Sequence, residues 1–140
     1  MPDHSIKESL VKIPYPELVN LYGCVIRSDA FIGPFVEIQS DVFIGTRTRI
    51  SSHSFVCSGV IIGDDCFIGH GVMFVNDLFS DSDSMNSWIK RNTVVGNRVR
   101  IGSNATILPV NIGDDVIIGA GSVVTTDIPS GATVKGNPAE

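Results

Sequence analysis

The sequence is poor in several features that mark common protein classes, and each shortage excludes something. Asp and Glu outnumber Lys and Arg, which leaves a net charge of −5 and argues against a nucleic-acid-binding protein. No apolar run approaches the length that spans a bilayer, so no membrane partner is expected. The N-terminal residues 1–10 lack the apolar core of a signal peptide, and we therefore expect a cytoplasmic protein.

Cysteine is also scarce, and its positions show no metal-binding pattern. Cys24, Cys57 and Cys66 form neither a CxxC pair nor another zinc-ligand spacing. Cys24 and Cys66 fall on a small, regularly spaced position of the repeat described next. We therefore expect them to be reduced residues of the core, without a redox role.

A six-residue repeat is the main feature of the chain. From residue 32 onward a large apolar side chain recurs every six residues, at Ile32, Ile38, Ile44, Ile50, Val56, Ile62, Ile68 and Phe74. Glycine often follows at once, as at Gly33, Gly45, Gly63 and Gly69. A period of six fits neither an α-helix nor one long strand, but it fits short strands joined by tight corners and stacked into a prism.

This pattern resembles the hexapeptide repeat of the left-handed parallel β-helix acyltransferases over about residues 20–138. In that family three hexads form one triangular coil, so residues about 18 apart stack. The resemblance implies an all-β domain over residues 20–140 with about five coils. Residues 1–19 are expected to be a cap or tail, in which residues 5–11 could form a short helix that ends before Pro14.

One long insertion interrupts the repeat. After Phe74 the next position in register is Val95, which lies 21 residues on (95 − 74) where six are due. We expect a loop over about residues 75–93 that leaves one corner of the prism, and such loops are more often functional than idle. Met85 and Trp88 are expected to pin this loop to the coil or to a neighbouring subunit.

The stacking of coils predicts that several potentially catalytic residues lie at two neighbouring corners of the prism. His53 and Gly71 are 18 residues apart and should lie one above the other, with His70 beside them. Asn76 and Asp77 stand at the next corner, where the loop departs. We therefore expect these side chains to lie near one another or near the same groove between subunits.

Three segments resemble the nucleotide-linked 3-amino-sugar N-acetyltransferases: residues 52–57 (SHSFVC), 69–77 (GHGVMFVND) and 103–109 (SNATILP). The resemblance implies transfer of acetyl from acetyl-CoA to the C3 amine of a dTDP-linked 3-amino-3,6-dideoxyhexose. This sugar would serve the biosynthesis of surface polysaccharides such as lipopolysaccharide. The resemblance also implies a homotrimer with each active site between adjacent subunits.

The same resemblance assigns roles at the site. Asn76 would contact the sugar amine or its neighbours, Asp77 would orient them, and His53 or His70 would be the general base. Free backbone N–H groups at the corners could stabilise the oxyanion. Some enzymes of this group are thought to work without a protein base, so that alternative stays open.

The C-terminal part of the chain also resembles the acyltransferases, in residues 118–125 (IGAGSVVT) and 136–139 (GNPA), which flank a turn at 127–131 expected to leave the β-helix. The predicted acetyl-CoA contacts are Ser103, Ala120, Gly121, Ser122, Thr125 and Lys135. Small side chains let a pantetheine arm lie close to the coil, although glycine at a tight corner also has a purely structural reason. The candidate phosphate-binding cations are Arg47, Arg49, Lys90, Arg91, Arg98, Arg100 and Lys135.

Other functions fit the same fold. Within the acyltransferases the acceptor could be a UDP-linked 3-amino-uronic acid or another amine or hydroxyl, and a non-catalytic β-helix scaffold belongs to another class. The γ-type carbonic anhydrases bind zinc through three histidines, but His4 lies in the tail and only His53 and His70 lie on the prism. No metal is therefore expected.

Overall fold

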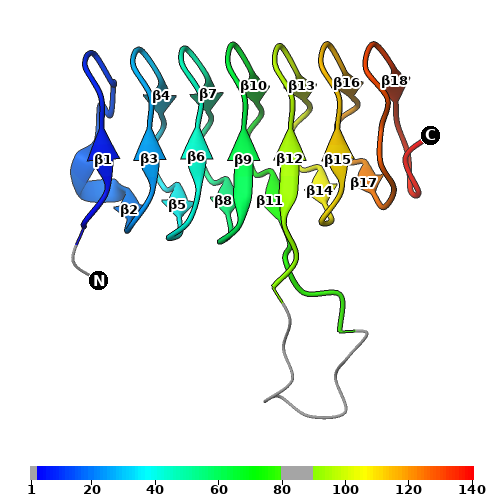
Figure 1. Cartoon of the computed structure of the whole chain (residues 1–140), viewed down its shortest axis with the longest axis horizontal. Helices are drawn as coiled ribbons and strands as arrows, with labels where there is room; N and C mark the ends of the chain where they lie inside the picture. Colours follow the sequence, from blue (N-terminus) through cyan, green and yellow to red (C-terminus); the bar gives the residue numbers. More distant parts are fainter. Residues whose placement is uncertain (1–2, 80–89) are drawn as a thin grey trace.

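The computed structural model describes residues 3–79 and 90–140 as a parallel β-helix with three sheets along its sides (Figure 1). Sheet A contains β1 (Ile6–Lys7), β3 (Val25–Ile26), β6 (Phe43–Ile44), β9 (Val60–Ile62), β12 (Thr93–Val95) and β15 (Asn111–Ile112). Sheet B contains β4 (Phe31–Ile32), β7 (Arg49–Ile50), β10 (Phe67–Ile68), β13 (Arg100–Ile101), β16 (Ile117–Ile118) and β18 (Thr133–Val134). Sheet C contains β2 (Asn20–Leu21), β5 (Glu37–Ile38), β8 (Phe55–Val56), β11 (Met73–Phe74), β14 (Thr106–Ile107) and β17 (Val123–Val124). In the described ranges the one helical segment is the 3-10 turn η1 (Pro16–Leu18), and no helix there is long and apolar enough to cross a bilayer.

Each full coil runs through sheets A, B and C in turn. In Figure 1 the chain climbs along the front strands, passes behind and advances toward its C-terminus, which is a left-handed turn. The predicted all-β, left-handed parallel β-helix is confirmed. We call the A-to-B, B-to-C and C-to-A connections the first, second and third corners. In the coil that starts with β6 they are residues 45–48, 51–54 and 57–59.

The hexad forms this fold because it places one large apolar side chain per strand inside the prism. Ile32, Ile50 and Ile68 stack in register across sheet B and are fully buried. Each such side chain contributes roughly 1.5–3 kcal/mol by burial. Glycines that follow the apolar residue sit at corners where the next coil is close: a Cβ on Gly45 would clash with the Gly63 carbonyl oxygen.

Both ends of the β-helix extend further than the sequence predicted. Residues 6–7 form β1, parallel to β3, so the short helix expected over residues 5–11 is wrong. At the other end Ile128 bridges to Ile112 and β18 pairs with β16, so residues 127–131 continue the β-helix instead of leaving it. These partial coils give about seven turns where about five were predicted. Irregular spacing hid them, although the backbone N–H and C=O groups of the neighbouring coils still require partners.

The inserted loop leaves the third corner between β11 and β12, as predicted. Its two ends meet where the Arg91 N–H donates to the Asn76 carbonyl oxygen over 3.2 Å. Met85 and Trp88 lie outside the described residues. The role of residues 1–19 as a cap stays a prediction.

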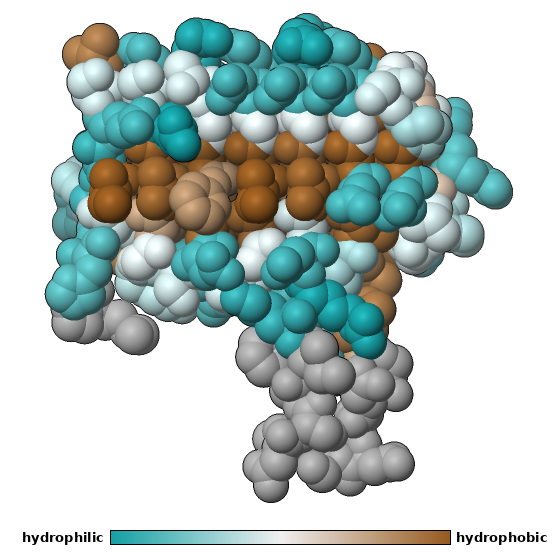
Figure 2. All heavy atoms as spheres, viewed as in Figure 1, coloured by the Kyte–Doolittle hydropathy of each residue, from teal (hydrophilic) through white to brown (hydrophobic). Residues whose placement is uncertain are grey.

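An apolar row crosses the outer face of sheet A (Figure 2). Its most exposed members are Ile6, Phe43, Ile61 and Val94, with exposed fractions of 62%, 40%, 45% and 39%. Single exposed apolar residues are ordinary on protein surfaces, whereas a contiguous row of them is typical of surfaces that contact another molecule.

Candidate active site

His70 lies on the second corner, held by one serine from the coil on each side. Its ring nitrogen Nδ1 is 2.9 Å from Ser52 Oγ, and its backbone N–H donates to Ser103 Oγ over 3.2 Å. The register dictates this arrangement, because β10 pairs with β7 on one side and with β13 on the other. When Nδ1 donates to Ser52, the exposed ring presents Nε2 as an acceptor, which is the form that a general base requires.

His53 lies on the same corner one coil earlier, but its ring has a different partner. The ring centroid is 5.0 Å from that of Phe35, with the two planes inclined by 32°. His53 adopts a left-handed backbone conformation with φ 67°, and Gly71 above it has φ 65°. The predicted stacking of these two residues at an offset of 18 is therefore confirmed, and the two histidines share one edge of the prism.

Asn76 and Asp77 lie at the third corner and line a hollow on sheet C together with Phe55, Met73 and Phe79. The Asn76 amide Nδ2 donates to the Ser58 carbonyl oxygen over 3.0 Å. Asp77 Oδ1 accepts the backbone N–H of Phe79 over 2.8 Å. Both side chains are half-buried and line the hollow; the coil below holds Asn76, whereas the hydrogen bond of Asp77 is to the loop itself.

Lys90 ties the returning end of the loop to the coils beneath it. Its Nζ lies 2.6 Å from Asp41 Oδ2 and 3.4 Å from Ser58 Oγ. Ser58 thus contacts both ends of the loop, since its carbonyl oxygen also accepts the amide of Asn76. This contact holds the base of the loop, and with it Asn76, against the third corner.

The predicted acetyl-CoA contacts gather around the second corner near the C-terminal end. Ala120 and Gly121 are exposed, and nothing lies within 4 Å of a Cβ placed on Gly121. The Ser122 hydroxyl is buried, donates to the Gly119 carbonyl oxygen over 2.6 Å and accepts the Gly136 N–H over 3.2 Å. Its observed role is therefore to brace the corner from inside.

The other predicted cofactor contacts differ in their surroundings. Thr125 lies after β17 at the third corner and is exposed, and Lys135 follows β18 and is exposed. Lys135 stacks on the second corner, since its Cβ lies 3.0 Å from a Cβ placed on Gly119. Ser103 is half-buried beside His70, as described above. Most of these residues thus share an edge with His70, and Thr125 does not.

The candidate catalytic residues lie at both edges of sheet C. His53 and His70 stand at the second corner, and Asn76 and Asp77 stand at the third, with β11 between them. Sequence reasoning missed Ser52 as the partner of His70, although their separation of 18 residues is the stacking offset that could have revealed it.

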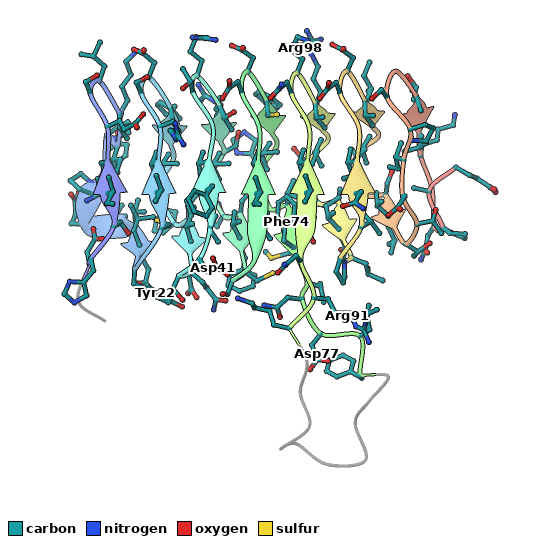
Figure 3. All side chains as sticks on the ribbon, viewed as in Figure 1. Tyr22, Asp41, Phe74, Asp77, Arg91 and Arg98 are labelled. Atoms are coloured by element: carbon teal, nitrogen blue, oxygen red, sulfur yellow. The ribbon has the colours of Figure 1, made fainter. Side chains whose placement is uncertain are left out.

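Several cations that the sequence offered for phosphate binding are paired with carboxylates. Arg47 Nε lies 2.7 Å from Asp65 Oδ1, and Arg98 Nε lies 2.8 Å from Asp115 Oδ1, both at the first corner. Hydrogen bonds from the guanidinium groups lower the pKa of the Asp65 and Asp115 carboxyls. In Figure 3 Arg98 lies on the edge opposite Asp77, away from the candidate site.

The three cysteine thiols are buried and are expected to have low reactivity. All three cysteines are free and buried, and burial raises the pKa of each, to about 11 for Cys57. Because the thiolate is the reactive form, these side chains will react slowly with thiol reagents. Within residues 3–79 and 90–140, no group of three or more His, Cys, Asp or Glu side chains is arranged to hold a metal ion.

The chain shares its repeat and its fold with known transferases. Residues 36–73 and 92–126 match the family model described as the hexapeptide repeat of succinyl-transferase. A serine acetyltransferase of Helicobacter pylori is 46% identical over 52 residues, which are 36% of this chain and 30% of that enzyme. The chain spans no more than 30% of the length of this enzyme and of other curated relatives that it matches.

Solved structures show the same fold over almost the whole chain. A hexapeptide transferase family protein from Anaplasma phagocytophilum has a TM-score of 0.80 at 19% identity, over 97% of this chain and 76% of its own. The N-acyltransferase AntD from Bacillus cereus, in complex with dTDP and coenzyme A, has a TM-score of 0.77 at 20% identity, over 99% of this chain and 82% of its own. With the repeat matched over more than half of its length, this chain belongs to the hexapeptide-repeat transferase family.

Proposed function

We propose that this protein transfers acetyl from acetyl-CoA to the C3 amine of a dTDP-linked 3-amino-3,6-dideoxyhexose. Family membership supports acyl transfer. The fold shared with an N-acyltransferase bound to dTDP and coenzyme A supports a nucleotide-linked amino acceptor. The reaction would take place in the cytoplasm and supply a sugar for surface polysaccharides such as lipopolysaccharide.

The observation that carries this proposal is the pair of groups on the two sides of β11. His70 presents Nε2 from the second corner because Ser52 engages Nδ1. Asn76 and Asp77 line the hollow on sheet C from the third corner. An acceptor lying along this face could meet a base at one edge and hydrogen-bonding groups at the other.

The chemistry required of these residues is modest. The uncharged amine attacks the thioester carbonyl, and His70 Nε2 can accept the proton that it gives up. The C–S bond then breaks, and CoA leaves as the thiol after its sulfur takes up that proton. Asn76 can bind the sugar beside the amine through its amide oxygen, because Nδ2 is already engaged by Ser58. Orientation of the two substrates supplies much of the remaining acceleration.

The exposed backbone at Ala120 and Gly121 fits the pantetheine arm of acetyl-CoA. The side chains there are minimal and the space over Gly121 is open. Lys135, on the same edge, can pair with a phosphate oxygen of the cofactor. Ser103 and Ser122 support this edge through the hydrogen bonds described above, and Thr125 remains a proposed contact from the third corner.

We also propose that the protein is a homotrimer with active sites between adjacent subunits. The apolar row on sheet A supports self-association, because Ile6, Phe43 and Ile61 would otherwise stay in water (Figure 2). Sedimentation should give a mass three times 15.0 kDa. Ile61→Asp should lower that mass, whereas a wild-type protein that sediments as a monomer would refute the trimer.

The testing experiment measures CoA release with a thiol reagent. Acetyl-CoA is supplied with dTDP-3-amino-3,6-dideoxyhexose, and in parallel with UDP-3-amino-glucuronate. The protein itself should give little background, because its three thiols are buried and have raised pKa values. We expect rapid release with the dTDP sugar and an acetylated product by mass spectrometry.

Each result of this experiment has a definite meaning. Turnover with the UDP acid alone would keep the acetyl transfer and replace the acceptor. No turnover with either sugar would refute the amino-sugar function and leave a family member whose acceptor is another amine or hydroxyl, or a non-catalytic β-helix.

A further inference from the structure

Two aromatic rings stand side by side on the second corner in the N-terminal half of the prism. The Phe35 ring is 55% exposed, and its centroid is 5.0 Å from that of the exposed His53 ring. Phe35 follows β4 and His53 follows β7, so the two rings belong to consecutive coils. Neither ring is part of the core, and burial does not explain their presence.

The backbone conformation of Phe35 makes this ring unusual. Its φ is +61°, in the left-handed region that large side chains rarely adopt. Nearly all the equivalent corner positions in the full coils hold small or polar residues, namely Asp29, Asp41, Arg47, Asp65, Arg98, Asn104 and Asp115. Leu10 and Phe79 also combine a positive φ with exposure, so it is the neighbouring His53 ring, together with the conformation, that points to a binding role for Phe35.

A hollow opens beside the Phe35 ring. It is lined by Glu17, Leu18, Asn20 and Glu37 together with Phe35. The Glu37 carboxylate is held in place, since Tyr22 Oη donates to it over 3.1 Å and Asn20 Nδ2 over 3.4 Å.

The chemistry of this hollow selects one kind of ligand. The carboxylates of Glu17 and Glu37 repel phosphate, so the hollow does not suit the anionic part of a nucleotide. They accept hydrogen bonds from N–H groups, which a nucleobase carries on its edge. A flat uncharged ring with N–H donors fits both the exposed aromatic pair and the carboxylates.

We propose that Phe35 and His53 form a stacking platform for the nucleobase of the nucleotide-linked sugar. This inference rests on the proposed function and gives it a residue-level determinant of acceptor binding. Phe35 lies two coils from Asn76, about 10 Å along the prism at the spacing of neighbouring strands, and at the other edge of sheet C. An extended nucleotide sugar would therefore cross this face diagonally, with its base at Phe35 and its amino sugar beside Asn76.

The adenine of CoA is the other nucleobase that the reaction would bring. The edge proposed for CoA, at Ala120, Gly121 and Lys135, lies at the C-terminal end of the prism. The Phe35 platform lies at the N-terminal end, beside β2 and β5. The platform therefore suits the acceptor and not the cofactor.

Calorimetric titration of the full-length protein with dTDP, UDP and CoA tests the proposal. Phe35→Asn keeps a residue that tolerates positive φ and removes the ring. It should weaken dTDP binding about tenfold, in line with the contribution of one stacked base. Phe35→Tyr keeps the ring and should bind dTDP as the wild type does.

The matched control is Leu10→Asn. Leu10 is 72% exposed and has φ 62°, but it lies on the first corner, away from sheet C. This variant should bind dTDP like the wild type. CoA binding should be the same in all four proteins, and inorganic pyrophosphate should bind Phe35→Asn and the wild type equally.

Several results would overturn the platform. It fails if Phe35→Asn binds dTDP like the wild type, or if it loses CoA binding and keeps dTDP binding. It also fails if Phe35→Asn changes the sedimentation mass, because the ring would then pack against another copy of the chain. Loss of the platform with intact CoA release would leave the proposed function standing. Ring-dependent dTDP binding without acetyl transfer would refute that function and keep the platform.

Discussion

The first and second corners of this β-helix are built alike inside and differ outside. At the first corner Thr48 Oγ1 donates to the Gly63 carbonyl oxygen over 2.6 Å and accepts the Cys66 N–H over 3.1 Å. At the second, Ser54 Oγ donates to the Gly69 carbonyl oxygen over 2.9 Å and accepts the Val72 N–H over 3.2 Å. One inward hydroxyl thus braces two coils in each place.

The outer surfaces show the difference. The first corner pairs Arg47 with Asp65 and Arg98 with Asp115, so its charges are neutralised within the edge. The second corner exposes His70, whose Nε2 can meet a ligand, and the Phe35 and His53 rings. Because one backbone geometry supports both edges, the fold alone does not make a site. A site forms where exposed side chains keep hydrogen-bonding groups or aromatic faces that can contact a ligand.

The largest effect on the rate should follow from removing the exposed imidazole of His70. His70→Ala should lower kcat/KM for acetyl transfer by about 10²–10⁴-fold, because the amine loses its proton acceptor. The far-ultraviolet circular dichroism spectrum should not change, since the exposed ring does not contribute to the core. A loss of less than tenfold would show that the reaction proceeds without this base.

A smaller effect is expected across sheet C at the third corner. Asn76→Ala removes the hydrogen bond to Ser58 and the amide oxygen proposed to bind the sugar. We expect a loss in kcat/KM of about 10–100-fold and a decrease in unfolding free energy of about 1 kcal/mol. Urea denaturation and initial rates measure the two separately, and an unchanged rate would remove Asn76 from the site.

The inward hydroxyls of the two corners, Thr48 and Ser54, should have equal effects on stability when they are removed, unlike the outer residues. Thr48→Val and Ser54→Ala each leave a buried carbonyl and a buried N–H without their partner. Each should lower the unfolding free energy by about 1–3 kcal/mol, while the rate per folded molecule stays the same. Urea titration of the two variants would contradict this account if only the second-corner variant lost stability.

The smallest effect belongs to the ion pairs of the first corner. The Arg98 guanidinium lowers the pKa of the Asp115 carboxyl, so the pair stabilises the fold above the ordinary carboxyl pKa, near pH 4. This contribution is lost as the pH falls through the lowered pKa of the folded state. Because both groups are exposed, Asp115→Asn should shift the melting temperature only slightly at pH 7, and less as the pH falls through the lowered pKa of the carboxyl. A large shift at pH 7 would show that this edge is structural.

The sequence could predict the body of the fold because one spacing rule governs it. Ile32, Ile50 and Ile68 alone define the coil length, and the insertion shows itself as a break in that spacing. The end coils were missed because they break the spacing rule: Lys7 stands opposite Ile26 in β1, and Ile128 and Val134 follow Val124 by four and ten residues instead of six and twelve.

The candidate site was predictable only where the same offset applies. His53 and Gly71 were placed correctly at the second corner, and the bond between Ser52 and His70 obeys the same offset of 18. The contact between Lys90 and Asp41 joins residues 49 apart across the insertion, where no period operates. The pairing of Phe35 with His53 was missed because the hexad rule concerns inward residues, whereas both rings face outward.

The most direct test of this account is kcat/KM for acetyl transfer to the dTDP amino sugar in three proteins: wild type, His70→Ala and Arg98→Ala. Both substitutions remove an exposed side chain from a corner of the same geometry. The account predicts a loss of at least about 100-fold for His70→Ala and a rate within about twofold of wild type for Arg98→Ala. Equal losses in the two variants, or a larger loss in Arg98→Ala, would contradict the claim that the second corner holds the site.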